Sequence, residues 1–163
     1  MSPRKARKQA EDATPGTPRV SNRRAFHDYH ILEKVECGIA LRGTEVKSLR
    51  AGKASLEGAF GRIRDGEAFL CGANIAVYPQ ATGALQHEPL RERKLLLHRR
   101  QLRKLESLVA QKGHTLVPLS LYFSRGRAKC ELAAAVGKRA YDKRHAIQKR
   151  QQQRDIEREM RRR

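Results

Sequence analysis

Alternating apolar and polar positions dominate the middle of the chain and predict β-strands. Over residues 29–41 one parity carries Tyr29, Ile31, Val35, Cys37, Ile39 and Leu41, interrupted at Glu33, while His30, Lys34 and Glu36 fall on the other. This period of two is typical of a strand that buries one face. Alternation returns over 114–123 and 128–132, where Pro118 indicates an edge or a bulge. These segments predict a sheet of long strands.

The clearest local signal is a β-hairpin around Asp65-Gly66. The dipeptide separates two short alternating segments, 60–64 and 67–71. Asp-Gly readily adopts the positive φ angles of a type I′ turn, which joins two antiparallel strands tightly. We therefore expect these two segments to pair with each other.

Two segments have the features of helices. Residues 43–52 predict a short helix, with Thr44 as its N-cap and Gly52 as its end. A second helix is expected between Pro89 and Gly113, because apolar residues there are spaced by 7, 3 and 4 positions: Leu95, Leu102, Leu105 and Val109.

The second predicted helix is also strongly basic. His98 falls on its apolar side, where we expect a histidine hydrogen-bonded at the edge of the core. The basic side chains would form a face able to contact phosphates: Arg91, Arg93, Lys94, Arg99, Arg100, Arg103 and Lys104.

The order of these elements is β-α-β-β-α-β-β, with room for further strands over 72–79. Several antiparallel strands with few helices predict a mainly β fold with α: a small antiparallel β-barrel of oligonucleotide-binding type, with about three helices packed outside and a basic C-terminal tail. A ferredoxin-like open sandwich is the alternative.

Charge indicates the kind of partner. The chain has 163 residues, with 36 Lys and Arg against 17 Asp and Glu, a net charge of +19. Such an excess favours a polyanion, either nucleic acid or an anionic membrane surface. No apolar stretch approaches the roughly 18 to 20 residues of a membrane-spanning helix, and the N-terminus lacks a secretory signal. We expect a cytoplasmic protein.

The excess charge divides the chain into three parts. Residues 1–24 carry a net charge of +5, residues 25–136 carry +7, and residues 137–163 carry +7. Only the middle part has the apolar pattern of a packed core. We therefore expect a disordered basic arm over 1–21, an RNA-binding β-barrel domain over 22–136, and a tail over 137–163 that is disordered when free.

The sequence argues against metal binding and catalysis. No pair of cysteines or histidines has the spacing of a zinc site, so we expect no metal, no cofactor and three reduced, half-buried thiols: Cys37, Cys71 and Cys130. Gly52-Lys53 is followed by alanine, which excludes a phosphate-binding loop of the Walker type. His27 and His30 would lie on opposite sides of an extended segment, so we expect no catalytic residues.

Folded RNA is the nucleic acid that fits best. The basic helical segment over 90–112 has no aromatic side chains, which disfavours a membrane interface. No zinc finger or heptad zipper is present, and aromatic residues make up only 5% of the chain, too few for a stacking platform for single strands. With these alternatives disfavoured, we expect the protein to recognise the shape and backbone of a folded RNA.

A series of motifs, in order over about 22–150, resembles the bacterial SsrA-binding protein (small protein B) family. The N-terminal ones are Asn22-Arg23-Arg24-Ala25, His27-Asp28-Tyr29, Glu36-Cys37-Gly38-Ile39 and Gly43-Thr44-Glu45-Val46-Lys47-Ser48-Leu49-Arg50-Ala51-Gly52-Lys53. The others are Asp65-Gly66-Glu67-Ala68-Phe69, Arg91-Glu92-Arg93-Lys94-Leu95-Leu96-Leu97 and Gly137-Lys138-Arg139-Ala140-Tyr141-Asp142-Lys143-Arg144.

The resemblance implies a function in ribosome rescue. Such a protein would bind the tRNA-like domain of transfer-messenger RNA (tmRNA) and deliver it to stalled ribosomes for trans-translation, which tags incomplete proteins for degradation. Elongation factor Tu and alanyl-tRNA synthetase would be indirect partners, and the protein would be a monomer. A structural ribosomal or assembly protein, and an RNA-processing enzyme, are the alternatives.

The resemblance also implies which residues bind RNA. The implicated positions match Glu36, Leu96, His98 and Lys129, with His98 standing where the family commonly has Asn. We expect the wider RNA-binding set of the core to include Asn22, Arg23, Arg24, Lys47, Arg50, Lys53, Arg91, Arg93 and Lys94.

The tail is implied to bind the small ribosomal subunit. It would enter the decoding centre and the empty message channel and fold there as a helix. The matching motif comprises Gly137, Lys138, Arg139, Asp142, Lys143 and Arg144. In a helix, Lys143, Ile147 and Arg150 would align, Tyr141 could stack on a base, and Lys149 would add charge.

Overall fold

The computed structural model describes residues 18–81, 83, 86–138 and 160 of the chain. The predicted arm up to residue 17 and the tail over 139–159 and 161–163 lie outside the described residues. Within the described part, no helix is both long and apolar enough to cross a membrane.

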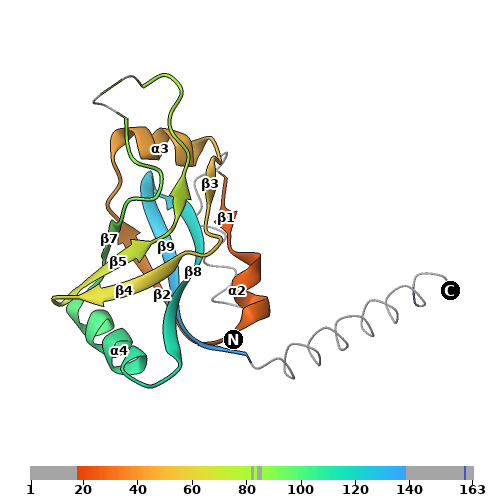
Figure 1. Ribbon diagram of the computed structural model, residues 1–163, viewed down its shortest axis with the longest axis vertical. Helices are drawn as coiled ribbons and strands as arrows, with labels where there is room; N and C mark the ends of the chain where they lie inside the picture. Colours follow the sequence, from red (N-terminus) through yellow and green to blue (C-terminus); the bar gives the residue numbers. More distant parts are fainter. Residues whose placement is uncertain (1–17, 82, 84–85, 139–159, 161–163) are drawn as a thin grey trace.

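Six antiparallel strands close into a ring (Figure 1). Around the ring they are β8 (His114–Ser124), β4 (Phe60–Arg64), β5 (Glu67–Cys71), β7 (Arg93–Leu96), β2 (Tyr29–Ile39) and β9 (Arg127–Gly137), and β9 pairs back with β8. Two short additions are β1 (Val20–Ser21), which pairs with β8, and β3 (Ala54–Ser55), which pairs with β6 (Asn74–Ile75). A mainly β fold is thus confirmed, and closure of the ring excludes the open sandwich.

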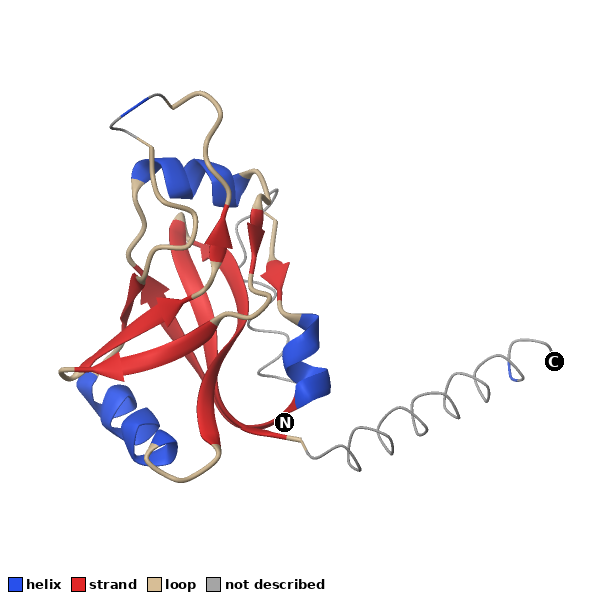
Figure 2. Ribbon diagram, in the orientation of Figure 1, coloured by secondary structure: helices blue, strands red, loops and turns tan. Residues whose placement is uncertain are grey.

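Three helices of the described domain pack around the ring (Figure 2). They are α2 (Arg23–Asp28), α3 (Gly43–Arg50) and α4 (Arg99–Val109). Figure 1 shows α3 and α4 at opposite ends of the ring, with α2 beside β1 and β8. Asn22 begins α2: its side-chain oxygen accepts a hydrogen bond from the Ala25 amide at 3.1 Å, which satisfies one free donor of the first turn.

The predicted hairpin is confirmed. Strand β4 pairs with β5, and Asp65 and Gly66 have φ angles of +53° and +69°, as a type I′ turn requires. Pro118 also lies where expected, because the register between β8 and β9 shifts between Pro118 and Ser120.

The start of the second helix was predicted wrongly. Helix α4 begins only at Arg99, and Leu95 belongs to strand β7, where it pairs with both Ala68 and Ile39. Burial along β7 alternates, with Arg93 and Leu95 inside and their neighbours outside. Leu95 and Leu102 therefore belong to two different elements, a strand and a helix. Their seven-residue spacing resembles a helical repeat only because both side chains pack into the same core.

The predicted N-cap of α3 was also wrong. The cap position is Arg42, whose backbone amide donates to the Glu45 carboxylate at 2.6 Å. The Thr44 hydroxyl instead lies 2.8 Å from Nδ1 of His87, a buried residue that ties the long loop after β6 to the helix.

The core has two parts. The larger part fills the ring and includes Leu70, Leu121 and Leu132, each with no exposed surface. The smaller part lies beneath α2, where Ala25 packs against the outward residues of β8 and β9. Strand β8 is therefore buried on both faces, and all three cysteines are buried and unbridged.

Closure of the ring depends on a close approach at Gly61. This residue of β4 is paired with Leu116 of β8, and a Cβ added at Gly61 would lie 2.7 Å from the Leu116 Cβ. A Cβ cannot rotate away, so the two strands would have to separate.

We expect Gly61→Ala to lower the free energy of unfolding by about 1 to 3 kcal/mol, because the added methyl overpacks this contact. The matched control is Gly43→Ala at the start of α3, where an added Cβ meets no atom within 4 Å. Urea unfolding followed by circular dichroism would compare the two. Equal stability of both variants would contradict the proposed role of Gly61.

Candidate RNA-binding surface

A groove of about 600 Å³ lies where strands β2, β5, β7 and β9 meet the start of α4. Strand β2 contributes Glu36, β7 contributes Leu96 and β9 contributes Lys129. His98 is the residue that directly precedes α4. These are the four positions that the family resemblance implicates in RNA binding. They are distant in sequence, and the ring of strands brings them to one surface.

The register of the strands places Leu96 and Lys129 on either side of Gly38. Gly38 is the Cα partner of Leu96 on β7 and of Lys129 on β9. A side chain at Gly38 would begin 3.2 Å from the Leu96 Cβ, so the glycine makes room for Leu96. The Leu96 side chain remains exposed, at 54%. It offers an apolar contact within a polar groove.

Glu36 orients the cation of the groove. Its carboxylate accepts a hydrogen bond from the Tyr122 hydroxyl and lies 3.2 Å from Nζ of Lys129. Burial and the neighbouring Glu36 carboxylate raise the pKa of Tyr122 above its ordinary value, so the phenol keeps its proton and acts as a donor. One carboxylate thus fixes Lys129 at the groove, and the ammonium retains further donors for a phosphate.

Sequence reasoning missed Tyr122 and Arg127. Tyr122 is the Cα partner of Lys129 across the β8–β9 hairpin, and Arg127 lines two hollows that adjoin the groove and also contain Lys129. The sequence could have indicated Tyr122, because pairing 114–123 with 128–132 around the predicted turn places Tyr122 opposite Lys129. The turn composition predicted the hairpin but not which side chains it presents.

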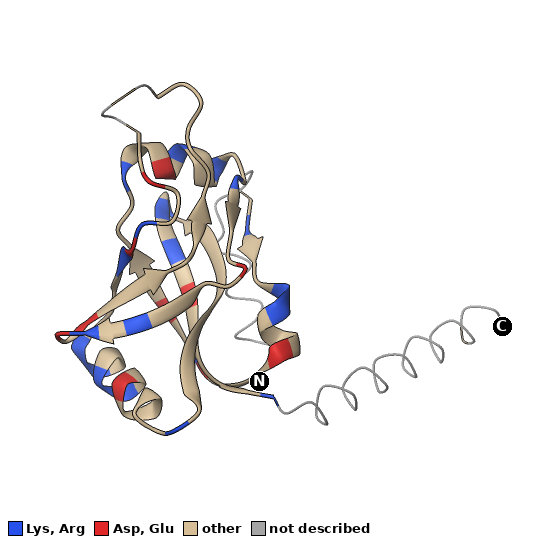
Figure 3. Ribbon diagram, in the orientation of Figure 1, with Lys and Arg blue, Asp and Glu red and all other residues tan. Residues whose placement is uncertain are grey.

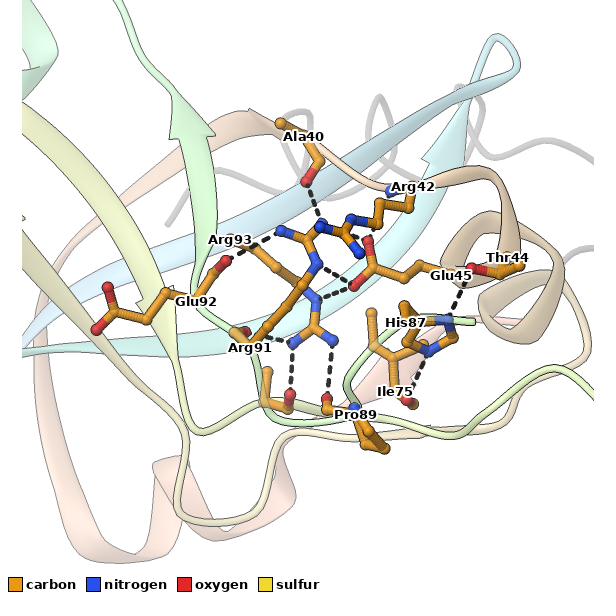
Figure 4. Close-up of polar contacts among 11 residues, drawn as sticks. Ala40, Arg42, Thr44, Glu45, Ile75, His87, Pro89, Arg91, Glu92 and Arg93 are labelled. Atoms are coloured by element: carbon orange, nitrogen blue, oxygen red, sulfur yellow. Dashed lines mark hydrogen bonds and ion pairs between the residues drawn. The ribbon is translucent and has the colours of Figure 1, made fainter. Parts of the chain in front are cut away.

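Two arginines expected to contact RNA instead bind the carboxylate of Glu45 (Figure 4). Arg93 Nε and Arg91 Nε each donate to Glu45 Oε1 at 2.8 Å. The other Arg93 nitrogens donate to the backbone oxygens of Ala73 at 2.6 Å and Pro89 at 2.8 Å. Arg93 and Glu45 have no exposed surface.

The expectation for Arg93 is therefore corrected. Its guanidinium is enclosed and hydrogen-bonded within the domain, so it cannot reach RNA. Arg91 is partly accessible, but its side chain also pairs with Glu45. A short basic motif reveals charge; it does not reveal which side of a strand the charge occupies.

The remaining residues of the core set differ in their surroundings. Asn22 is buried, and its amide also donates to the backbone oxygens of Leu56 and Pro118, so its observed role is in the fold. Arg24 pairs with Glu57, and Lys94 pairs with Glu67, both at the surface. Such exposed pairs contribute little to stability and can be exchanged for other partners.

The basic residues of and after α3 form a separate group. The Lys47 ammonium lies 5.0 Å from the centre of the Tyr78 ring, and the Arg50 guanidinium lies 5.4 Å from that of Phe123. Lys53 is exposed just after the helix, and Arg23 is exposed on α2. None of these four lines the groove.

The root of the tail is fastened to α2. The Lys138 amide donates to the Asp28 backbone oxygen at 2.8 Å, and its ammonium donates to that of Phe26 at 2.9 Å. Gly137 pairs with Tyr29, at the opposite end of the β2–β9 pair from Lys129. The two residues are eight positions apart along β9, or about 26 Å.

The other predicted tail residues lie outside the described residues: Arg139, Tyr141, Asp142, Lys143, Arg144, Ile147, Lys149 and Arg150. Among the residues that are described, no three His, Cys, Asp or Glu side chains gather as metal ligands would.

Together these features define a small, mainly β protein with a basic surface, the class that contacts nucleic acids. Residues 19–162 match the sequence model of the family described as SmpB protein. The chain belongs to this SmpB family, which confirms the resemblance noted in its sequence.

Curated relatives and a solved structure agree. The SsrA-binding protein of Thermobifida fusca is 52% identical over 97% of this chain and 99% of its own length. That of Chloroflexus aggregans is 54% identical over 88% of this chain and 91% of its own length. A chain from a structure described as "tmRNA-SmpB: a journey to the center of the bacterial ribosome" is 53% identical, covers 80% of this chain and 94% of that chain, and has a TM-score of 0.65.

Glu45→Gln should destabilise the protein strongly. The amide keeps the shape but leaves Arg93 as a buried charge without a counterion, which costs about 3 to 5 kcal/mol at pH 7. Urea unfolding would measure this loss. Glu67→Gln, which breaks an exposed pair, is the control and should change the free energy of unfolding by about 0 to 1 kcal/mol.

Acid should reduce the difference between wild type and Glu45→Gln. Burial raises the pKa of Glu45, but hydrogen bonds from Arg91, Arg42 and Arg93 outweigh burial and hold that pKa below its ordinary value of 4.5. Its contribution to stability is therefore complete above about pH 4.5 and is lost as pH falls through the lower folded pKa. A difference that stayed constant from pH 6 to pH 3 would contradict this assignment.

Proposed function

We propose that this protein binds the tRNA-like domain of tmRNA and delivers it to stalled ribosomes for trans-translation. The observation that carries the proposal is the groove, where Glu36, Leu96, His98 and Lys129 come together although they are far apart in sequence. Family membership supports the same function, because relatives along nearly the whole chain are SsrA-binding proteins.

In this proposal each groove residue has a distinct role. Lys129 neutralises a phosphate, and Glu36 holds Lys129 in place while its remaining lone pairs can accept from a ribose hydroxyl. Leu96 packs against the apolar face of a base or sugar. His98 lies exposed at the mouth of the groove before α4 and supplies a ring nitrogen for hydrogen bonding.

The tail has a separate role in the same proposal. Residues 137–163 leave the domain beside α2 and enter the decoding centre and message channel, where they neutralise phosphates of the small-subunit RNA as they fold into a helix. The core over 22–136 keeps the delivered RNA about 26 Å from the tail root, as the length of the β2–β9 pair indicates. The arm over 1–21 adds positive charge.

The ring acts as an oligonucleotide-binding-type barrel, and the protein acts as a cytoplasmic monomer that holds RNA without catalysing a reaction. Elongation factor Tu and alanyl-tRNA synthetase are indirect partners, through the bound RNA.

Lys129→Ala should weaken binding of the tRNA-like domain by about tenfold or more. The variant loses a charge-assisted hydrogen bond, worth about 1.5 to 3 kcal/mol, and leaves Glu36 facing the RNA without its counterion. The control is Lys112→Ala, an exposed lysine beyond the far end of α4, which should change the Kd less than twofold. Fluorescence anisotropy with labelled RNA would measure both, and equal effects would contradict the groove assignment.

A chain that ends after Lys138 should bind the RNA nearly as well as the full chain and fail to support tagging on stalled ribosomes. This truncation keeps the contacts of Lys138 with α2, so the domain remains intact. The measurements are RNA binding and a reconstituted tagging assay. Loss of RNA binding in the truncated chain would show that the two-part mechanism is wrong.

A further inference from the structure

Helix α4 presents three arginines to solvent next to the groove. Arg99, Arg100 and Arg103 are exposed, whereas Leu105 is completely buried. At 100° per residue the arginines span an arc of about 100° on the side of the helix opposite Leu105. We call this set the arginine face.

The arginine face lacks carboxylate partners, which about half of the other basic residues in the described part of the chain have. Lys104, on the same helix, lies 2.7 Å from Glu33, and the basic residues of β7 pair with Glu45 and Glu67. In the part of the chain that the structure describes, no carboxylate oxygen lies within 4.0 Å of a nitrogen of Arg99, Arg100 or Arg103. Their charge is therefore not neutralised within the described domain.

The position of α4 connects this charge to the groove. Arg99, Gln101 and Leu102, all in the first turns of α4, line the groove together with Leu96 and Lys129. The residues of α4 after Leu102, up to Val109, do not line the groove. An RNA strand that lies in the groove would meet Arg99, which is the one member of the arginine face that lines the groove.

The composition of the helix favours a phosphate backbone as its ligand. Arginine presents several N–H donors in a plane that matches two phosphate oxygens. The eleven residues of α4 include no aromatic side chain, which an interfacial membrane helix would need as an anchor. The cationic face of α4 is thus suited to RNA phosphates.

We infer that the arginine face of α4 is a second contact surface for the RNA bound in the groove, and that Arg99 and Arg103 each bind a backbone phosphate of it. The inference rests on the proposed function, because the RNA is the one that Lys129 holds. Lys129 would act at one point of the RNA, and α4 would extend the contact along its backbone.

The test is the salt dependence of binding, because each phosphate contact that is lost lowers the slope of log K against log salt by about one. The probe is the tRNA-like domain of tmRNA with the full chain, between 50 and 200 mM KCl. For Arg99→Gln/Arg103→Gln we expect a slope smaller by about two, so that its loss of affinity relative to wild type shrinks about 16-fold across this range. Arg99→Lys/Arg103→Lys keeps both charges and should retain the wild-type slope.

The matched control is Arg42→Gln/Lys112→Gln, which removes two exposed charges before α3 and beyond the far end of α4. It should leave the slope nearly unchanged. The inference would be overturned if the two double Gln variants had the same slope of log K against log salt. It would also be overturned if Arg99→Gln/Arg103→Gln lost the same fraction of affinity at every salt concentration, because the arginine face would then contact only water. If Lys129→Ala also bound normally, the proposed function itself would fail, so the two failures are distinguishable.

Discussion

The carboxylate of Glu45 is the contact on which the arrangement of the domain depends. It belongs to α3 and binds both Arg91 and Arg93, so it joins the helix at one end of the ring to the start of β7. Strand β7 links β5 to β2 and thereby completes the ring, and its last residue, Leu96, reaches the groove. A charge buried this deeply requires its partner, because an unpaired one would cost several kcal/mol.

Pairing of charges within the domain decides which cations remain available for RNA. Glu45, Glu57 and Glu67 each hold at least one basic side chain, and Glu36 holds Lys129 at the edge of the groove. The overall charge of +19 therefore overstates how many basic side chains are free to bind RNA. Figure 3 shows acidic and basic positions intermingled on the ring, and α4 carries both basic positions and an acidic one.

The β2–β9 pair separates the groove from the root of the tail along its length. One end carries Lys129 and Glu36 at the groove, and the other carries Gly137 and the fastened root of the tail. This spacing fits the proposed function, in which the groove and the tail bind different RNAs.

Local sequence determined the elements whose pattern lies within a few residues. Asp65-Gly66 determined the hairpin, and the alternation over 29–39 determined β2, because turn geometry and strand periodicity depend on neighbouring side chains. The motifs also identified the family. Only the tertiary structure decided that Leu95 lies in a strand, that Arg93 is enclosed around Glu45, and that the groove residues meet. Each of those outcomes depends on contacts between segments 20 to 100 positions apart, which no local pattern encodes.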